Sequence, residues 1–372
     1  MINTYIPNIS KRDKNNIAKC LDSNFVSTAG PKIHDFEKAF SKIFNFKNAV
    51  AVNSGTSALH LALLSSGVQK DEFVIVPSYT FAATANAINY IGAKPWFFDC
   101  DNDLILDLKK LEEILKKKTK LKSNKLVDKS SGKIVKAIIP VQTMGRKIDF
   151  AKFERFAKKY CLKIIFDSAA CHDPKIMNFT KNKNSIFCFS FNGNKTITTG
   201  AGGIIATNSK FLSEKARILA NVGKSKSKYD YQEIGFNYKM TNMQASLGLS
   251  QLITLKKILK KKRDIFKIYK ELLVDNFNFI KINDNMYINW IFALMSKNRN
   301  FFIKIKKEFN SEKIQLDYFW KPLHLQNPYK KFRAEKCNIS NEIWDKIILL
   351  PSHPSINKKD QKKICSILNK SI

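Results

Sequence analysis

Short apolar runs alternate with amphipathic segments along the first two thirds of the sequence. Between the runs lie stretches with helical spacing, such as Leu108, Leu111, Ile114 and Leu115, which fall on one stripe of a helix. Strict alternation of strand and helix predicts βαβ units, and therefore an α/β protein with a mostly parallel sheet between helices. The runs that we expect to be buried strands are 49–53, 73–77, 95–99, 135–141, 162–167 and 185–191.

The pattern changes after about residue 245. A long helix is expected over residues 242–272, and fewer strand signals follow it. We therefore expect a large α/β domain over residues 1–245 and a smaller C-terminal α+β domain over residues 246–372. Residues 116–133 are polar and rich in lysine, so we interpret them as a surface excursion between a helix and the next strand, without a role that the sequence assigns.

The strongly basic composition does not by itself predict a nucleic-acid partner. The formal net charge is +34, but only seven of the 65 basic residues are arginine, the residue that makes bidentate contacts to phosphates and bases. The lysines are also spread along the whole chain, which is typical of a solvated surface. We therefore expect no nucleic-acid partner, although charge alone keeps that alternative open.

Other classes are excluded by what the sequence lacks. No run approaches the roughly 18 apolar residues of a membrane span, and the N-terminal residues lack a signal peptide's apolar core. Seven cysteines without a C-x-x-C pair, and five histidines without an i, i+4 pair, indicate neither a disulfide framework nor a metal site. We expect a cytoplasmic protein with no membrane partner and no bound metal.

A lysine in a glycine-rich loop is the first candidate for chemistry. Glycine is scarce, with 13 residues in the chain, yet four of them lie between Gly193 and Gly203. Lys195 stands in this loop, directly after an apolar run. A lysine desolvated at a strand end has a lowered pKa and can act as a nucleophilic amine that forms a Schiff base. The alternative is an ordinary surface charge.

Two further candidates follow other strands. Residues 53–57, Asn-Ser-Gly-Thr-Ser, open a helix, and free amides in a first helical turn favour a bound anion such as phosphate, although plain N-capping is an equally common use. Asp167 ends a strand at the edge of the sheet where α/β proteins bind ligands, and it could equally cap a helix. A lysine, a phosphate cradle and an acid to pair with a ring nitrogen are together what pyridoxal phosphate requires.

With these residues in place, the sequence resembles the DegT/DnrJ/EryC1/StrS family of pyridoxal-phosphate-dependent sugar aminotransferases over nearly its full length. The resemblance is closest to the branches that aminate C4 of GDP- or UDP-linked 4-keto-6-deoxy sugars. It implies the fold type I architecture of aspartate aminotransferase. The segments that carry it are NFVSTAGPKIHDFE, AVNSGTSALHLAL, VPSYTFAATANAI, IIFDSAA, SFNGNKTITTGAGG, GFNYKMTNMQASLGLSQL and FWKPLHLQ.

The resemblance assigns roles to single residues. Lys195 would be the Schiff-base lysine and proton shuttle, and Asp167 the partner of the pyridine nitrogen. Asn237 would reach the cofactor phosphate of a neighbouring subunit, which implies a homodimer with shared active sites. The remaining cofactor contacts would be Phe81 stacked on the ring, with Gly55, Thr56 and Ser190 at the phosphate, and the substrate side would include Thr28, Lys239 and His324.

Three positions depart from the family pattern. Ala170 stands where the family has Gln, His or Glu near the ring hydroxyl, Lys239 replaces an arginine, and Gln142 replaces a histidine. None of these changes removes Lys195, so the resemblance still implies transamination.

The function implied in this way is transfer of an amino group from L-glutamate to the C4 ketone of a nucleotide-diphosphate 4-keto-6-deoxy sugar, for amino sugars of surface polysaccharides. Pyridoxamine phosphate would be the aminated form of the cofactor. Amination at C3 and a non-catalytic regulator that binds pyridoxal phosphate are the alternatives. The sequence does not fix UDP, GDP or dTDP, nor the stereochemistry of amination.

Overall fold

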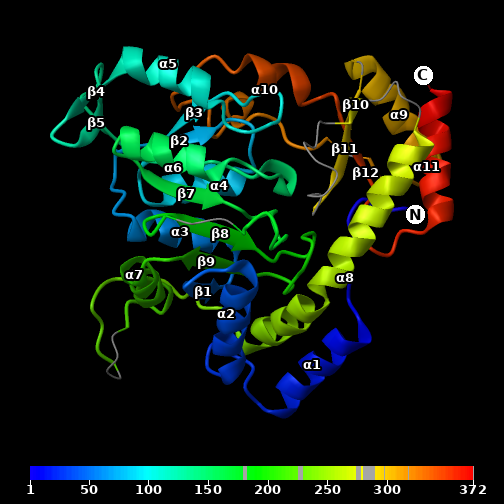
Figure 1. Ribbon diagram of the computed structural model, residues 1–372, viewed down its shortest axis with the longest axis horizontal. Helices are drawn as coiled ribbons and strands as arrows, with labels where there is room; N and C mark the ends of the chain where they lie inside the picture. The colour runs from blue at the N-terminus through cyan, green and yellow to red at the C-terminus, as the bar shows by residue number, and fades with distance from the viewer. Residues whose placement is uncertain are drawn as a thin grey trace.

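The computed structural model describes residues 1–178, 182–224, 229–273, 278–279, 290–296, 298–316 and 318–371. A large sheet and a small sheet organise this part of the chain, and the long helix α8 (Asn242–Leu272) runs from one to the other (Figure 1). The helix has the bounds expected from its apolar spacing. It begins with a capping box, in which Thr241 and Gln244 bond each other's backbone amides.

The large sheet contains nine strands in the described residues, in the order β1-β9-β8-β7-β6-β2-β3, with the β4–β5 hairpin joined to β6 through β5. Neighbouring strands from β8 to β3 are parallel, whereas β9 is antiparallel to both β8 and β1. The strands are β1 (Asn48–Val52), β2 (Phe73–Pro77), β3 (Lys94–Phe98), β4 (Thr119–Lys122), β5 (Lys125–Asp128), β6 (Ile134–Ile138), β7 (Lys163–Asp167), β8 (Ile186–Ser190) and β9 (Gly203–Thr207).

Helices cover both faces of this sheet, which confirms the predicted α/β layers. Alternate residues of each strand face opposite sides, so Phe187 and Phe189 of β8 pack in one apolar cluster and Ile186 and Cys188 in the other. One face is covered by α2 (Pro31–Phe44), α5 (Leu108–Lys118), α6 (Phe150–Lys159) and the first half of α8, and the other by α3 (Gly55–Ser65), α4 (Ala82–Tyr90) and α7 (Lys210–Ala220).

The small sheet consists of β10 (Asn278–Phe279), β11 (Phe292–Met295) and β12 (Ile347–Leu350), all antiparallel. It packs against α9 (Arg299–Ser311), α11 (Lys358–Lys370) and the second half of α8. Residues at the N-terminus join this region, since Ile2 pairs with Ile314. The boundary expected at residue 245 lies in the first turn of α8 and stays a prediction. The other helices are α1 (Lys11–Asp22) and α10 (Asn338–Ile343).

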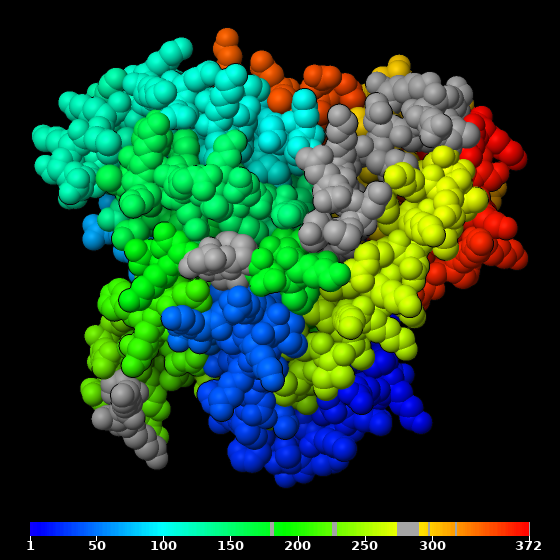
Figure 2. Space-filling model, viewed as in Figure 1, coloured from blue at the N-terminus to red at the C-terminus, as the bar shows by residue number. Residues whose placement is uncertain are grey.

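Two elements differ from the expectation. The lysine-rich segment 116–133 contains regular structure, because α5 continues to Lys118 and the β4–β5 hairpin follows it at one margin of the molecule (Figure 2). The hairpin is held by Leu126, which is buried, and by Asp128, which accepts a 2.7 Å hydrogen bond from Arg333. Strand β9 follows β8 with no helix between them, so a rule of strict alternation does not find it.

None of the helices in the described part of the chain combines the length and apolar character needed to cross a membrane.

Candidate active site

A cavity of about 360 Å³ lies where several strands of the large sheet end. Because the carboxyl ends of parallel strands meet at one edge, residues that follow β2, β6, β7 and β8 line it together. Its far wall comes from the N-terminal segment and the C-terminal third of the chain. Of the cofactor residues expected from the sequence, six line this cavity, namely Gly55, Thr56, Phe81, Asp167, Ser190 and Lys195.

Lys195 lies in the loop between β8 and β9, with its ammonium 3.9 Å from the centre of the Trp290 ring. Among the described residues no carboxylate forms an ion pair with it. Burial lowers the pKa of Lys195 to about 8, and the negative charge of Asp167 acts in the opposite direction. More of the amine is therefore unprotonated near neutral pH than in an ordinary lysine, which favours a nucleophile.

Asp167, the last residue of β7, is almost completely buried beside Lys195. Its Oδ2 accepts a 2.7 Å hydrogen bond from Thr84 Oγ1 on α4, and its Oδ1 accepts one of 3.1 Å from the Ala169 amide. Burial raises the pKa of Asp167, while these two hydrogen bonds and Lys195 lower it. The carboxylate is thus fixed in direction and lacks a full counter-charge, which suits a cationic ring nitrogen.

The first turn of α3 forms a third side of the cavity. The helix begins at Gly55, and Ser54 caps it by accepting a hydrogen bond from the Ser57 amide. The first amides of a helix have no acceptor within the helix, so those of Gly55 and Thr56 are available to an anion. A Cβ on Gly55 would lie 2.7 Å from Ser190 Cβ, so a side chain there would collide with β8.

An aromatic wall formed by Tyr5, Trp290, Phe319 and Trp320 closes the side opposite the sheet. Phe319 and Trp320 stack with their ring centres 4.1 Å apart, and Trp290 lies 6.4 Å from Trp320. Phe81 stands at the mouth and is 59% exposed. Sequence reasoning missed this wall, although consecutive aromatic residues at 319 and 320 were a usable signal.

Residues 7–369 match the sequence profile of the DegT/DnrJ/EryC1/StrS aminotransferase family. The chain belongs to this family. It is a sugar aminotransferase, as expected from the sequence, and it has the fold of the solved aminotransferases of this family.

The chain is similar to named relatives and to solved structures over nearly its whole length. The chain is 31% identical to GDP-perosamine synthase of Escherichia coli O157:H7, with 99% of this chain and 98% of the relative covered. It is 30% identical to UDP-4-amino-4,6-dideoxy-N-acetyl-beta-L-altrosamine transaminase of Campylobacter jejuni serotype O:2, with 95% and 93% covered. The crystal structure of a DegT DnrJ EryC1 StrS aminotransferase from Brucella abortus superposes with a TM-score of 0.87 at 27% identity, covering 96% of this chain and 95% of that one.

Four residues expected at the site lie outside the cavity. Thr28 is half-buried in the segment before α2, and Asn237 is exposed. The backbone of Lys239 forms an isolated β-bridge with Val52, and burial lowers the pKa of the Lys239 side chain. His324 Nδ1 and Ser78 Oγ share a hydrogen bond of 2.5 Å. Their expected roles stay predictions.

Two of the departures from the family pattern line the cavity. Ala170 is buried and packs in the cluster that contains Trp290. Gln142 is buried, and its Nε2 donates a 2.8 Å hydrogen bond to the Arg146 carbonyl. Its Oε1 has no hydrogen-bond partner in the described part of the chain. Gln142 therefore brings an unused acceptor to the end of β6.

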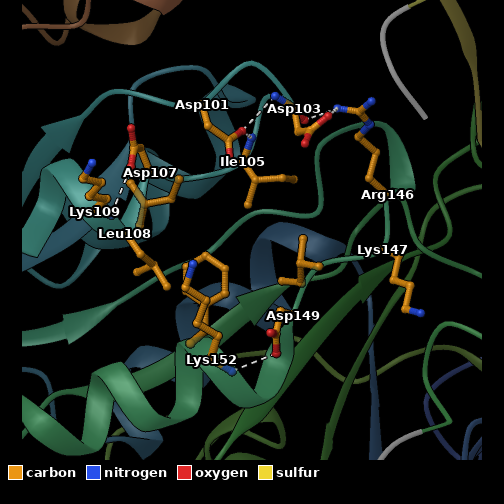
Figure 3. A pocket seen from close by; sticks show the side chains of 13 residues that line it. Asp101, Asp103, Ile105, Asp107, Leu108, Lys109, Arg146, Lys147, Asp149 and Lys152 are labelled. Carbon is orange, nitrogen blue, oxygen red and sulfur yellow. Dashed lines mark hydrogen bonds and ion pairs between the residues drawn. The ribbon is translucent and has the colours of Figure 1, made fainter. Parts of the chain in front are cut away.

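A second hollow, of about 280 Å³, lies between the residues before α5 and those before α6 (Figure 3). Three of its four carboxylates accept hydrogen bonds from backbone amides: Asp107 caps α5, Asp149 caps α6, and Asp101 binds the amides of Asp103 and Ile105. The fourth, Asp103, lies 3.6 Å from Arg146 Nη1. These charges stabilise turns, helix ends and an ion pair.

The residues of that cavity fit the cofactor of the family, pyridoxal phosphate. Asp167 offers a buried charge that seeks a cation, and Lys195 offers an amine of lowered pKa. The start of α3 offers free amides beside a position that only glycine can occupy without a clash. Groups that suit the aldehyde, the ring nitrogen and the phosphate of the cofactor thus line one cavity.

Proposed function

We propose that this enzyme transfers an amino group from L-glutamate to the C4 ketone of a nucleotide-diphosphate 4-keto-6-deoxy sugar, with pyridoxal phosphate as cofactor. The observation that carries the proposal is that Lys195, Asp167 and the start of α3 line one cavity. The regiochemistry is supported by the Campylobacter relative, whose name describes a 4-amino-4,6-dideoxy sugar. The product would serve amino-sugar and surface-polysaccharide synthesis.

Pyridoxal phosphate, when bound, supplies an aldehyde that takes up the amino group and a protonated ring that accepts electrons. The carboxylate of Asp167 holds the proton on the ring nitrogen. The amides of Gly55 and Thr56, with Ser190 Oγ, would bind the phosphate, and Phe81 would contact the ring and help to exclude water. Each of these residues orients the cofactor and leaves the movement of protons to Lys195.

Lys195 Nζ is the proposed acid and base. With a pKa of about 8 it takes a proton from the α-carbon of the amino donor, and it later returns one to C4 of the sugar. The net reaction converts glutamate and a keto sugar into 2-oxoglutarate and an amino sugar. Asp167, the other charged side chain among the described residues that line the cavity, is held in place by hydrogen bonds from Thr84 and Ala169.

The proposed assembly is a homodimer whose active sites are shared. Its support is the exposed position of Asn237, outside the cavity of its own subunit, and the exposed apolar side chains of Phe25, Tyr231 and Ile234. Mixing a Lys195→Ala variant with an Asn237→Ala variant tests this directly. Subunit exchange should restore part of the activity that each variant lacks alone, and no recovery in a mixture shown to exchange subunits would contradict shared sites.

The cytoplasm is the proposed location. Its support is that all seven cysteines, each at a described position, carry free thiols, as is usual in a reducing compartment.

A panel of nucleotide sugars tests the function. The purified protein is incubated with pyridoxal phosphate, L-glutamate and UDP-, GDP- or dTDP-linked 4-keto and 3-keto hexoses, and products are identified by mass spectrometry and NMR. We expect a 4-amino sugar from one 4-keto substrate. Lys195→Ala should be inactive, whereas the exposed Lys210→Ala should match the wild type. Amination of a 3-keto sugar alone would replace the C4 assignment, and failure of the glutamate half-reaction would favour a non-catalytic protein.

A further inference from the structure

A second lysine is buried in the middle of α8, where the proposed reaction gives it no role. Lys262 is only 4% exposed, and its Nζ donates hydrogen bonds of 2.5 Å to the Trp290 carbonyl and 2.9 Å to the Ser352 carbonyl. No carboxylate in the described residues pairs with it. Burial lowers the pKa of Lys262 to about 7. Removing an ammonium group from water is unfavourable, so packing alone does not explain a lysine at this position.

Trp290 connects Lys262 to the proposed active site. It lies two residues before β11, and its carbonyl is held by Lys262. Its indole Nε1 donates a 2.8 Å hydrogen bond to the carbonyl of Asn194, the residue before Lys195. The face of the same ring lies 3.9 Å from Lys195 Nζ, in the range of a cation–π contact. One side chain thus contacts both the backbone and the ammonium group at the catalytic position.

The connection crosses the interface between the two sheets. Lys262 belongs to the half of α8 that lies beside the small sheet, and Lys195 belongs to a loop of the large sheet (Figure 1). A small cavity of about 20 Å³ is lined by both lysines and by Trp290, so the three residues border one space. Trp290 is held at three points, because its backbone carbonyl, its indole Nε1 and the face of its ring all have partners.

We propose that Lys262 is a positioning residue, which fixes Trp290 so that the indole face holds the amine of Lys195. The inference rests on the proposed role of Lys195. It also gives α8 a role in the active site. The helix begins beside the large sheet, and Lys262 in its second half holds Trp290 of the aromatic wall. Without the donor, the Trp290 and Ser352 carbonyls lose this partner, and the Trp290 ring keeps its bond to the Asn194 carbonyl but is held less firmly against Lys195.

Four variants of the full-length protein test the proposal: Lys262→Met, Trp290→Leu, the double variant, and Lys261→Met as the matched control on the exposed side of α8. Two rates report on Lys195. The first is its acetylation by limiting acetic anhydride in the cofactor-free protein, measured by peptide mass spectrometry. The second is the growth of the visible absorption band after pyridoxal phosphate is added.

We expect both single variants to speed acetylation of Lys195 at least fivefold, because the ring no longer covers the amine or stabilises its charged form. Capture of pyridoxal phosphate should slow at least fivefold, because this reaction needs the amine to be held in position in the cavity, which outweighs its greater exposure. Each rate of the double variant should lie within twofold of that of the more strongly affected single variant, since both changes remove the same contact between Trp290 and Lys195. Lys261→Met should match the wild type, and circular dichroism should show that every variant is folded.

Two results would overturn the inference. One is a Lys262→Met protein with a lower melting temperature but with both rates within twofold of the wild type, which would make the lysine purely structural. The other is a double variant whose effects multiply. If Lys262→Met does not fold, Lys262→Gln, which keeps an N–H donor, is compared with Trp290→Leu by the same criteria. If the wild type itself fails to capture pyridoxal phosphate, the proposed function fails, whereas the acetylation rates still decide the role of Lys262.

Discussion

Thr84 Oγ1 donates a 2.7 Å hydrogen bond to Asp167 Oδ2, and both side chains are buried. Thr80 Oγ1 lies 3.0 Å from Thr84 Oγ1 and donates to it, because Thr84 uses its own proton at the carboxylate. Two hydroxyls at the start of α4 therefore set the direction of the acid at the end of β7. Sequence reasoning had assigned no role to either threonine.

Thr84→Val should weaken cofactor binding. The change keeps the shape of the side chain but removes the donor to Asp167, and a hydrogen bond to a charged group contributes about 1.5–3 kcal/mol. We expect the Kd for pyridoxal phosphate to rise about tenfold or more, measured by absorbance titration. Thr80→Val is the control, because its hydroxyl reaches Thr84 and not the carboxylate, and it should have a smaller effect. Equal Kd values for Thr84→Val and the wild type would show that Asp167 does not depend on this bond.

The pH dependence of cofactor capture should reveal the lowered pKa of Lys195. Only the neutral amine attacks an aldehyde, and an ordinary lysine reaches that form near pH 10.4, whereas burial lowers the pKa of Lys195 to about 8. The rate of capture by the cofactor-free protein should rise with pH and level off just above 8. Stopped-flow absorbance measures this profile. A rate that still rises tenfold between pH 9 and pH 10 would contradict the lowered pKa.

The lowered pKa of Lys195 also predicts how the free energy of unfolding changes with pH. Between pH 8 and about 10.4 the unfolded chain keeps a proton on Lys195 that the folded protein has released, so this group makes the free energy of unfolding rise with pH. Denaturant unfolding of the wild type and of Lys195→Met at pH 7.5 and pH 9.5 measures it. The wild type should gain stability relative to the variant, and a relative loss would reverse the assigned direction.

The residues that the sequence identified and those it missed differ in a physical way. Asp167 and Lys195 were predictable because Asp167 ends an apolar strand and Lys195 stands in the loop after another, and strand ends meet at one edge of a parallel sheet. Thr84 and Trp290 were not, since their partners lie far away along the chain and only the packing of α4 and β11 brings them together. Lys262 is one of several consecutive lysines on a helix, and spacing alone does not separate it from its exposed neighbour Lys261.

The same distinction applies to the fold. Parallel strands β2 and β7 were found because burial on both faces makes them nearly continuous apolar runs. The β4–β5 hairpin is rich in lysine and lies at an exposed edge, where only Thr119, Leu126 and Asp128 are buried, so its composition is that of a loop.

Gly55→Ala should impair the binding of phosphate at α3. The new methyl group would lie 2.7 Å from Ser190 Cβ, closer than such atoms approach, so the helix start or β8 must shift. We expect the affinities for pyridoxal phosphate and for inorganic phosphate to fall together, measured by titration calorimetry. Gly193→Ala is the control, since its Cβ would meet nothing closer than the Gly200 carbonyl at 4.0 Å. A Gly55→Ala protein with wild-type affinity for both ligands would remove α3 from the phosphate site.

Arg217→Met should destabilise the fold around β1. Arg217 on α7 donates hydrogen bonds of 3.0 and 2.9 Å to the two carboxylate oxygens of Glu37, and Glu37 also accepts one of 2.8 Å from the Ala51 amide. The Glu37 side chain is only 5% exposed, so loss of the arginine leaves a buried carboxylate with one remaining donor. Because Arg217 itself is half exposed, water can replace part of the interaction, and we expect a loss of about 2 kcal/mol in the free energy of unfolding.

The matched control is Lys210→Met on the same helix. Lys210 pairs with Glu214, both side chains are exposed, and the change should alter the free energy of unfolding by less than about 0.5 kcal/mol. Urea unfolding of the two variants should therefore differ clearly, and equal midpoints would mean that solvent already screens the Glu37 carboxylate.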